Sequence, residues 1–176
     1  MKKALFLDRD GVINHQIVGG YVTRLEEFEF HANVLAALEI LADSFDYIFI
    51  VTNQQGIGKG VFSQKDLDEI HQFMLNNITE NGGRIDKIYV CPDLAKNNST
   101  CRKPNIGMGI QALRDFPGIE VSHSVMVGDT ESDMEFGRRL GLKTIFLTNG
   151  NQDKIPKADF IFNNLWEFAT AQATIC

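Results

Sequence analysis

The chain has 176 residues and a net charge of −6 at pH 7, and it is 44% hydrophobic and 23% charged. This size and composition are typical of one globular domain, and we expect residues 1–176 to form a single domain. The acidic balance argues against a nucleic-acid partner or an anionic membrane surface, since phosphate groups attract basic surfaces. No apolar run is long enough for a membrane span or a signal peptide, so we expect a cytoplasmic protein without a membrane partner, and a monomer.

Short apolar segments alternate with longer segments of helical spacing along the chain. The short ones are rich in β-branched or aromatic residues and predict buried strands at residues 4–7, 47–51, 87–90, 125–127, 144–147 and 160–162. Apolar side chains at helical spacing predict helices around residues 34–41, 67–78, 134–140 and 165–173. Ser63 and Asp66 form a potential capping box before the second helix. This alternation predicts an α/β fold with a Rossmann-like, doubly wound, mostly parallel sheet.

Polar and charged residues follow the predicted strands, and ligands bind outside the carboxyl ends of parallel strands. The residues are Asp8, Asp10, Thr52, Asn53, Gln54, Arg102, Lys103, Asp129 and Asp133. Any one of them could be a helix cap, a turn residue or a surface charge. As a set, however, clustered carboxylates are costly unless a cation offsets them, and Mg²⁺ prefers carboxylate oxygens. The sequence therefore predicts a Mg²⁺ ion that, with Lys103 and Thr52, binds a phosphate dianion.

The spacing of the first two aspartates indicates that one acts as the nucleophile and the other as the general acid and base. Asp8 can attack phosphorus and form an aspartyl-phosphate. Asp10 lies one residue further on, so its side chain points to the same side if the chain stays extended. It can then protonate the leaving oxygen and later deprotonate the attacking water. We expect the two pKa values to split accordingly, with Asp8 ionised and Asp10 protonated.

With these residues the chain resembles the haloacid dehalogenase-like phosphatases, whose four motifs match Asp8/Asp10, Thr52, Lys103 and Asp129 in order. It is most similar to the D-glycero-D-manno-heptose 1,7-bisphosphate 7-phosphatases and to the related histidinol-phosphate phosphatases. The matching stretches are LDRDGVIN, GGYV, FEF, TNQQGIGKGVF, CRKPNIGM and VGDTESDM. The resemblance implies a phosphomonoester hydrolase that acts on a small phosphorylated metabolite. The intervals between the motifs leave no room for an inserted domain, so we expect a capless haloacid dehalogenase-like fold.

The resemblance also implies roles for individual residues. Mg²⁺ would be held by the Asp8 and Asp129 side chains and the Asp10 backbone carbonyl, while Thr52 and Lys103 would hold the phosphoryl group. Contacts with the rest of the substrate are implied for Gly20, Tyr21, Asn53, Gln54 and Arg102.

The loop before Lys103 departs from the family pattern. Many relatives carry a zinc site there, patterned Cys-x-His and then Cys-x-Cys, whereas this chain has Cys91-Pro92-Asp93 and Ser99-Thr100-Cys101. Structural zinc requires four good nitrogen or sulfur ligands, so we expect no zinc at Cys91, Asp93 and Cys101. With Cys176 the chain has three cysteines, which are too few for a disulfide framework.

Several alternatives share parts of this pattern. The stretch GGYVTRLEEFEF favours heptose bisphosphate over histidinol phosphate as the substrate. A polynucleotide 3′-phosphatase uses the same chemistry, but the acidic balance argues against it. Receiver domains of signalling systems also combine clustered acids, Mg²⁺, a threonine and a lysine. They place the phospho-acceptor on a later strand and lack the neighbouring acid, which Asp-x-Asp on the first strand supplies here.

Overall fold

The computed structural model describes residues 2–151 and 153–172. Among these residues, six strands form one parallel sheet in the order β3-β2-β1-β4-β5-β6. The strands are β1 (Ala4–Leu7), β2 (Tyr47–Asn53), β3 (Lys87–Cys91), β4 (Val125–Gly128), β5 (Lys143–Leu147) and β6 (Phe160–Phe162). The predicted parallel α/β fold is confirmed, and every predicted strand is present within two residues of its expected ends. The predicted burial is wrong for β6, because this strand lies at the edge of the sheet and exposes Phe160 and Ile161.

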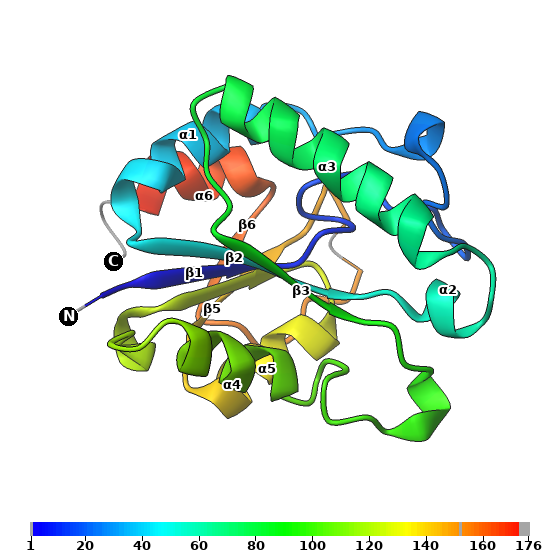
Figure 1. Ribbon diagram of the computed structural model, residues 1–176. Helices are drawn as coiled ribbons and strands as arrows, with labels where there is room; N and C mark the ends of the chain where they lie inside the picture. Colours follow the sequence, from blue (N-terminus) through cyan, green and yellow to red (C-terminus); the bar gives the residue numbers. More distant parts are fainter. Residues whose placement is uncertain (1, 152, 173–176) are drawn as a thin grey trace.

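Helices cover both faces of the sheet (Figure 1). On one face lie α1 (Val34–Ser44), α3 (Gln64–Glu80) and α6 (Leu165–Ala171), and on the other lie α4 (Gly107–Asp115) and α5 (Glu131–Leu140). Shorter helical segments occupy the loops: α2 (Gln55–Gly58), η1 (Leu25–Glu27), η2 (Ala95–Asn97) and η3 (Val121–His123). The sheet is therefore doubly wound, as predicted.

The central strand β1 is buried on both faces because its side chains alternate between two hydrophobic clusters. Leu5 and Leu7 belong to the cluster under α1, α3 and α6, whereas Ala4 and Phe6 belong to the cluster under α4 and α5. The carboxyl end of β1 consequently lies at the middle of the sheet edge, with β2 on one side and β4 on the other.

Local capping sets where the helices begin. The capping box before α3 is confirmed: the Asp66 backbone N–H donates to Ser63 Oγ at 3.2 Å, and the Ser63 N–H donates to Asp66 Oδ2 at 2.7 Å. A second capping box joins Thr130 and Asp133 at the start of α5. The predicted last helix is confirmed through Ala171, while its expected end at residue 173 lies outside the described residues, as does residue 176.

The sequence pattern did not predict α4, because glycine is a poor helix former and this helix contains Gly107 and Gly109. Tertiary packing explains both glycines. A Cβ on Gly107 would lie 2.5 Å from the Thr100 carbonyl oxygen, and one on Gly109 would lie 2.4 Å from Leu140 Cδ2. Close approach of the chain outweighs the low helix propensity at these positions.

The described connections between the first three strands contain helices and loops but no further domain. Between β1 and β2 the described chain forms η1 and α1, and between β2 and β3 it forms α2 and α3. No inserted cap occurs in these described segments, which confirms the capless fold. Within the described part of the chain, no helix is long and apolar enough to cross a bilayer.

Candidate active site

The predicted site residues meet at the carboxyl edge of the three central strands. Asp8 follows β1 directly, Thr52 lies near the end of β2, and Asp129 follows β4. Asp8 is held in line with the sheet because its backbone N–H donates to the Val127 carbonyl at 3.0 Å. Since β2, β1 and β4 are neighbours, the sheet order places these side chains around one point.

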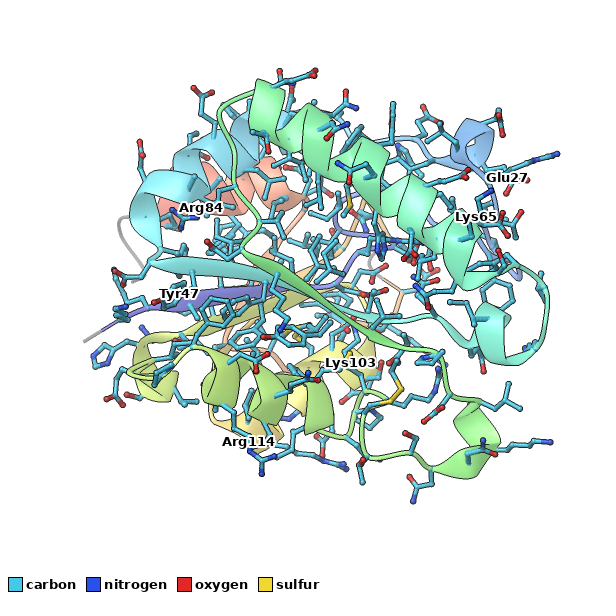
Figure 2. The ribbon with its side chains drawn as sticks, in the orientation of Figure 1. Glu27, Tyr47, Lys65, Arg84, Lys103 and Arg114 are labelled. Atoms are coloured by element: carbon cyan, nitrogen blue, oxygen red, sulfur yellow. A yellow bond between two sulfur atoms is a disulfide. The ribbon has the colours of Figure 1, made fainter. Side chains whose placement is uncertain are left out.

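Lys103 brings a cation to Asp8, and its side chain lies near the carboxyl edge (Figure 2). It is only 3% exposed, and its Nζ lies 2.8 Å from Asp8 Oδ1 and 2.6 Å from Asp133 Oδ1. Burial alone would lower the pKa of Lys103, but the Asp133 and Asp8 charges outweigh it and raise that pKa. Asn53 fixes the lysine backbone, because its side-chain amide accepts from the Lys103 N–H and donates to the Lys103 carbonyl. The ammonium is therefore held charged between two carboxylates.

Three carboxylates form a compact acidic group. Asp8, Asp129 and Asp133 each offer an oxygen within 4.8 Å of the others. Burial and then the Asp133 charge raise the pKa of Asp8 to about 7, and burial with the charges of Asp8 and Asp133 raises that of Asp129 to about 8. Asp129 Oδ1 is buried without a hydrogen-bond partner among the described residues. This donor set, with its unpartnered oxygen, fits a divalent cation that prefers carboxylate ligands.

Asp133 is the member of this group to which the sequence assigned no metal role. It is fully buried and also caps α5, where Thr130 Oγ1 donates to its Oδ2 at 2.6 Å. Its other oxygen, Oδ1, pairs with Lys103. Asp133 therefore fixes the lysine relative to the start of α5.

Gly11 allows the loop after β1 to approach Asp129. Its φ is +88°, and a Cβ there would lie 2.0 Å from Asp129 Oδ2. The Asn149 side-chain amide donates to the Gly11 carbonyl at 2.8 Å and holds the loop in place. A larger residue at position 11 would displace the Asp129 carboxylate.

Asp10 is oriented by side-chain donors and not by extension of the strand. The chain turns directly after Asp8, and the Arg9 carbonyl accepts from the Ile13 N–H at 2.8 Å. Arg9 Nη2 donates to both Asp10 oxygens, at 2.7 and 2.9 Å. The amides of Gln54 and Asn14 donate to one oxygen each, both at 2.9 Å. The chain is therefore not extended from Asp8 to Asp10, as the predicted direction of the Asp10 side chain required. The Asp10 carboxylate has four donor contacts instead.

The pKa values of the two aspartates split in the opposite order to the one expected. Burial would raise the pKa of Asp10, but the Arg9 charge and the hydrogen bonds from Arg9, Asn14 and Gln54 outweigh it and lower that pKa. The pKa of Asp8, by contrast, is raised to about 7. In the ligand-free chain, Asp10 is thus the more readily ionised of the pair.

Arg9 and His71 are two buried groups of the site that sequence reasoning missed. Arg9 is fully buried, and its Nη1 donates to His71 Nε2 at 3.3 Å. Burial and the Arg9 charge lower the pKa of His71 to about 4, so the imidazole is neutral and accepts this hydrogen bond at neutral pH. The sequence does contain a signal for the burial of His71, because this residue lies on the apolar face of the helix predicted for residues 67–78.

A cavity of about 150 Å³ adjoins Asp10. Four of the five residues expected to contact the rest of the substrate line it: Gly20, Tyr21, Asn53 and Gln54. The fifth, Arg102, lies on the neighbouring loop, where its Nη1 is 3.5 Å from the Asp93 carbonyl. Gln16 also lines the cavity and donates from Nε2 to Asp129 Oδ2 at 3.3 Å, a contact that the sequence did not indicate.

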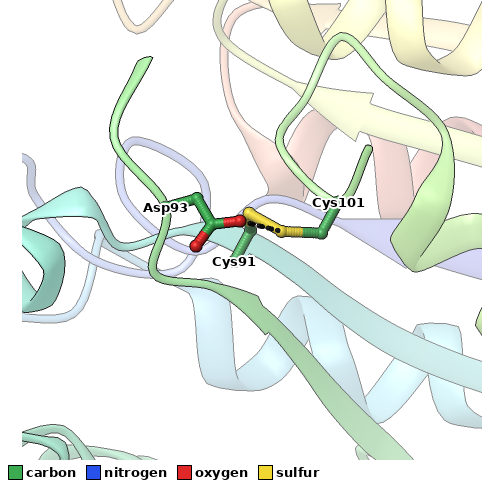
Figure 3. A group of neighbouring side chains, drawn as sticks. All are labelled: Cys91, Asp93 and Cys101. Atoms are coloured by element: carbon green, nitrogen blue, oxygen red, sulfur yellow. Dashed lines mark hydrogen bonds between the residues drawn. A yellow bond between two sulfur atoms is a disulfide. The ribbon is translucent and has the colours of Figure 1, made fainter. Parts of the chain in front are cut away.

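The cysteine loop differs from expectation. Cys91 and Cys101 form a disulfide, with their Cα atoms 5.6 Å apart, although three cysteines predicted no disulfide framework (Figure 3). The reason is that the loop folds back beside the end of β3, which a cysteine count does not reveal. Asp93 Oδ2 lies 3.6 Å from Cys101 Sγ, so the same three side chains are near enough to ligate one metal ion when the disulfide is reduced. The expected absence of zinc stays a prediction.

The chain is similar to proteins of known family. A family model described as HAD-hydrolase-like matches residues 100–168. The D-glycero-alpha-D-manno-heptose-1,7-bisphosphate 7-phosphatase of Mycobacterium bovis is 39% identical over 95% of this chain and 90% of its own length. The corresponding beta-heptose enzyme of Helicobacter pylori is 36% identical over 94% of each chain. Among solved structures, the D,D-heptose 1,7-bisphosphate phosphatase of B. bronchiseptica complexed with magnesium and phosphate is similar, with a TM-score of 0.89, 26% identity and 99% of each chain covered.

Proposed function

This chain belongs to the haloacid dehalogenase-like phosphatases, in one family with the heptose-bisphosphate phosphatases above, and we propose that it removes the 7-phosphate of D-glycero-D-manno-heptose 1,7-bisphosphate. The near full-length similarity to relatives of that name supports the substrate. The observation that carries the chemistry is the buried Lys103 ammonium between Asp8 and Asp133, beside the Asp129 carboxylate. Because relatives are named for either anomer, the proposal leaves the anomer open.

The first half of the reaction forms an aspartyl-phosphate. Lys103 and the Arg9 backbone N–H both contact Asp8 Oδ1, which leaves Oδ2 to attack phosphorus. The Gln54 amide donates to Thr52 Oγ1 at 2.9 Å, so the threonine hydroxyl can donate its own proton to a phosphoryl oxygen. The bond between phosphorus and the sugar oxygen breaks, and the sugar oxygen takes a proton from the Asp10 carboxyl group.

The second half hydrolyses the aspartyl-phosphate. The Asp10 carboxylate takes a proton from a water molecule, whose oxygen attacks phosphorus while the bond to Asp8 breaks. Phosphate leaves, and both side chains return to their starting protonation states. Asp10 thus donates one proton and recovers one in each cycle.

Substrate binding must reverse the pKa order of the ligand-free chain. A phosphate dianion beside Asp10 raises the pKa of that carboxyl group and offsets the effect of Arg9. A cation at Asp8 and Asp129 favours the ionised form of Asp8. The neutral His71 and the Gln54 amide keep Arg9 and Asp10 oriented in both protonation states.

The same carboxylates define the cofactor that we propose. Asp8 and Asp129 would hold Mg²⁺ through their side chains, with the Asp10 backbone carbonyl as a further ligand. When bound, Mg²⁺ supplies positive charge that offsets the carboxylates and the phosphoryl oxygens. Zinc is not part of the proposal.

Mg²⁺ should stabilise the fold more at high pH than at low pH. Asp8 and Asp129 have raised pKa values, so the folded chain binds more protons than the unfolded chain between about pH 4 and 8. Without metal, their contribution to stability therefore falls as the pH rises through this window. Because Mg²⁺ binds the ionised form, saturating Mg²⁺ should raise Tm by about 5 °C or more near pH 8, and by less than half of that near pH 5.

Thermal unfolding with and without Mg²⁺ checks this prediction. Asp129→Asn is the matched variant, since it removes one proposed ligand and should abolish most of the shift. Equal shifts at both pH values, or a full shift in the variant, would contradict the assignment of the metal to this acidic group.

Phosphate release in the presence of Mg²⁺ tests the proposed function directly. We expect kcat/KM for heptose 1,7-bisphosphate to exceed that for histidinol phosphate by about 100-fold or more, equivalent to roughly 3 kcal/mol of differential binding. Inorganic phosphate appears from both substrates, so one assay compares them. Preference for histidinol phosphate, or slow turnover of both, would overturn the substrate assignment and leave the phosphatase chemistry standing.

A further inference from the structure

One cation beside the active-site cavity has no role in the mechanism above. Lys59 follows α2 directly and is exposed. Its Nζ donates to the Tyr21 hydroxyl at 2.8 Å and lies 5.4 Å from the centre of the Tyr21 ring. Among the described residues, no carboxylate forms an ion pair with it. An exposed ammonium that is held on a tyrosine, without an acidic partner, has its positive charge available to a ligand.

Tyr21 connects this ammonium with the reaction centre. The tyrosine lines the cavity that also contains Asp10 and Gln54. Its ring packs against Phe62, with the ring centres 6.2 Å apart. Phe62 in turn packs on Gly56 of α2, where a Cβ would lie 2.2 Å from Phe62 Cε1. The ring of Tyr21 is therefore fixed between the cavity and the helix that precedes Lys59.

The backbone that carries Lys59 is also fixed. A Cβ on Gly58 would lie 2.5 Å from the Pro92 carbonyl oxygen, so α2 packs directly on the segment that follows β3. Arg102 contacts the next carbonyl of that segment, at Asp93. Gly58, the neighbour of Lys59, and Arg102 thus approach successive carbonyls of the same segment.

We propose that Lys59 and the Tyr21 hydroxyl bind the second phosphate of the substrate, the one that is not transferred. This inference rests on the proposed function, since only a bisphosphate brings a second dianion to the rim. The Tyr21 oxygen accepts a hydrogen bond from Lys59 and keeps its own proton to donate to a phosphate oxygen. Charge-assisted hydrogen bonds from an ammonium to a dianion are the stronger kind. In a chain of net charge −6, such a cation also offsets the repulsion of an incoming dianion.

The test compares two substrates that differ only in the second phosphate: the heptose 1,7-bisphosphate and the heptose 7-phosphate. For each enzyme, the preference is the ratio of the two kcat/KM values. We expect Lys59→Met to lower this preference about tenfold, mainly through a higher KM for the bisphosphate. Lys59→Arg should restore most of it, because the positive charge is kept. Tyr21→Phe should lower the preference by a smaller factor.

Lys65→Met is the matched control, since Lys65 is an exposed lysine on α3 whose partner is Glu69. It should keep the wild-type preference. Suppose that the wild-type enzyme favours the bisphosphate. An unchanged preference in Lys59→Met would then overturn the assignment of Lys59, and so would an equal loss of kcat/KM on both substrates. A wild-type enzyme that does not favour the bisphosphate would overturn the proposed function, and this inference with it.

Discussion

Replacing Asp8 by asparagine is expected to reduce phosphate release by about 10⁴-fold or more, because the amide cannot attack phosphorus. The fold should survive the change. Burial and neighbouring charges raise the pKa of Asp8 to about 7, so its ionised form is unfavourable in the metal-free chain. Asp133 still pairs with Lys103 in the variant. We therefore expect Asp8→Asn to have a Tm at least as high as the wild-type enzyme near pH 8 without Mg²⁺.

Asp10→Asn is the informative partner variant. It should slow turnover by about 10²- to 10⁴-fold through the loss of both proton transfers. Because the proposed metal contact of Asp10 is its backbone carbonyl, the Mg²⁺-dependent rise in Tm should remain. The variant should also be less stable than the wild-type enzyme, since fully buried Arg9 loses its charged partner.

Substantial turnover by Asp8→Asn would contradict the covalent mechanism.

Replacing Lys103 by methionine is expected to reduce both activity and stability. The change removes the cation from two carboxylates, which its Nζ contacts at 2.8 and 2.6 Å. Breaking a buried pair typically costs about 3 kcal/mol or more, which corresponds to a fall in Tm of roughly 10 °C for a chain of this size. Phosphate release should fall by about 10²- to 10³-fold, because the charge that we propose to hold the phosphoryl group is lost.

The pH dependence distinguishes this effect from a simple packing defect. Asp8, whose pKa is raised to about 7 by burial and the Asp133 charge, can take up a proton once the lysine charge is gone, so the loss of Tm in Lys103→Met should be smaller near pH 5 than near pH 8. Lys65→Met again serves as the control, because its exposed pair with Glu69 should contribute almost nothing to Tm. A loss of Tm that is independent of pH would show that Lys103 contributes by packing and not by charge.

The positions of the strands and of the site residues that follow them could be predicted from the sequence. Runs such as residues 4–7 and 160–162 are short and rich in branched or aromatic side chains, which predicts strands; only the first of these two strands is buried, because β6 lies at the edge of the sheet. Once the sheet is parallel, Asp8, Thr52 and Asp129 must lie at one edge. Their convergence therefore required no knowledge of side-chain contacts.

The orientation of Asp10 could not be predicted, because it depends on residues distant in sequence. Arg9 lies between the two aspartates and would point away from both in an extended strand. It contacts Asp10 because the chain turns after Asp8, and it is buried because His71 of α3 lies above that turn. The reversed pKa order of the two aspartates follows from these contacts, and no spacing rule contains them.

The disulfide of the cysteine loop could not be predicted for the same reason, because it depends on proximity in three dimensions. Cys91 and Cys101 are ten residues apart, and only the path of the intervening loop decides whether their side chains meet. The low helix propensity of Gly107 and Gly109 hid α4 for a related reason, since the benefit of these glycines comes from Thr100 and Leu140.

The capless arrangement separates the residues that we propose for the chemistry from those that we propose for substrate selection. Asp8 and Asp129 follow β1 and β4, whose residues are all buried. Tyr21 and Lys59, by contrast, lie on connections that can change in length or composition without disturbing the sheet. Substrate preference in such a protein can therefore diverge through loop changes while catalytic power is retained. New specificities are accessible in small, separately tolerated steps.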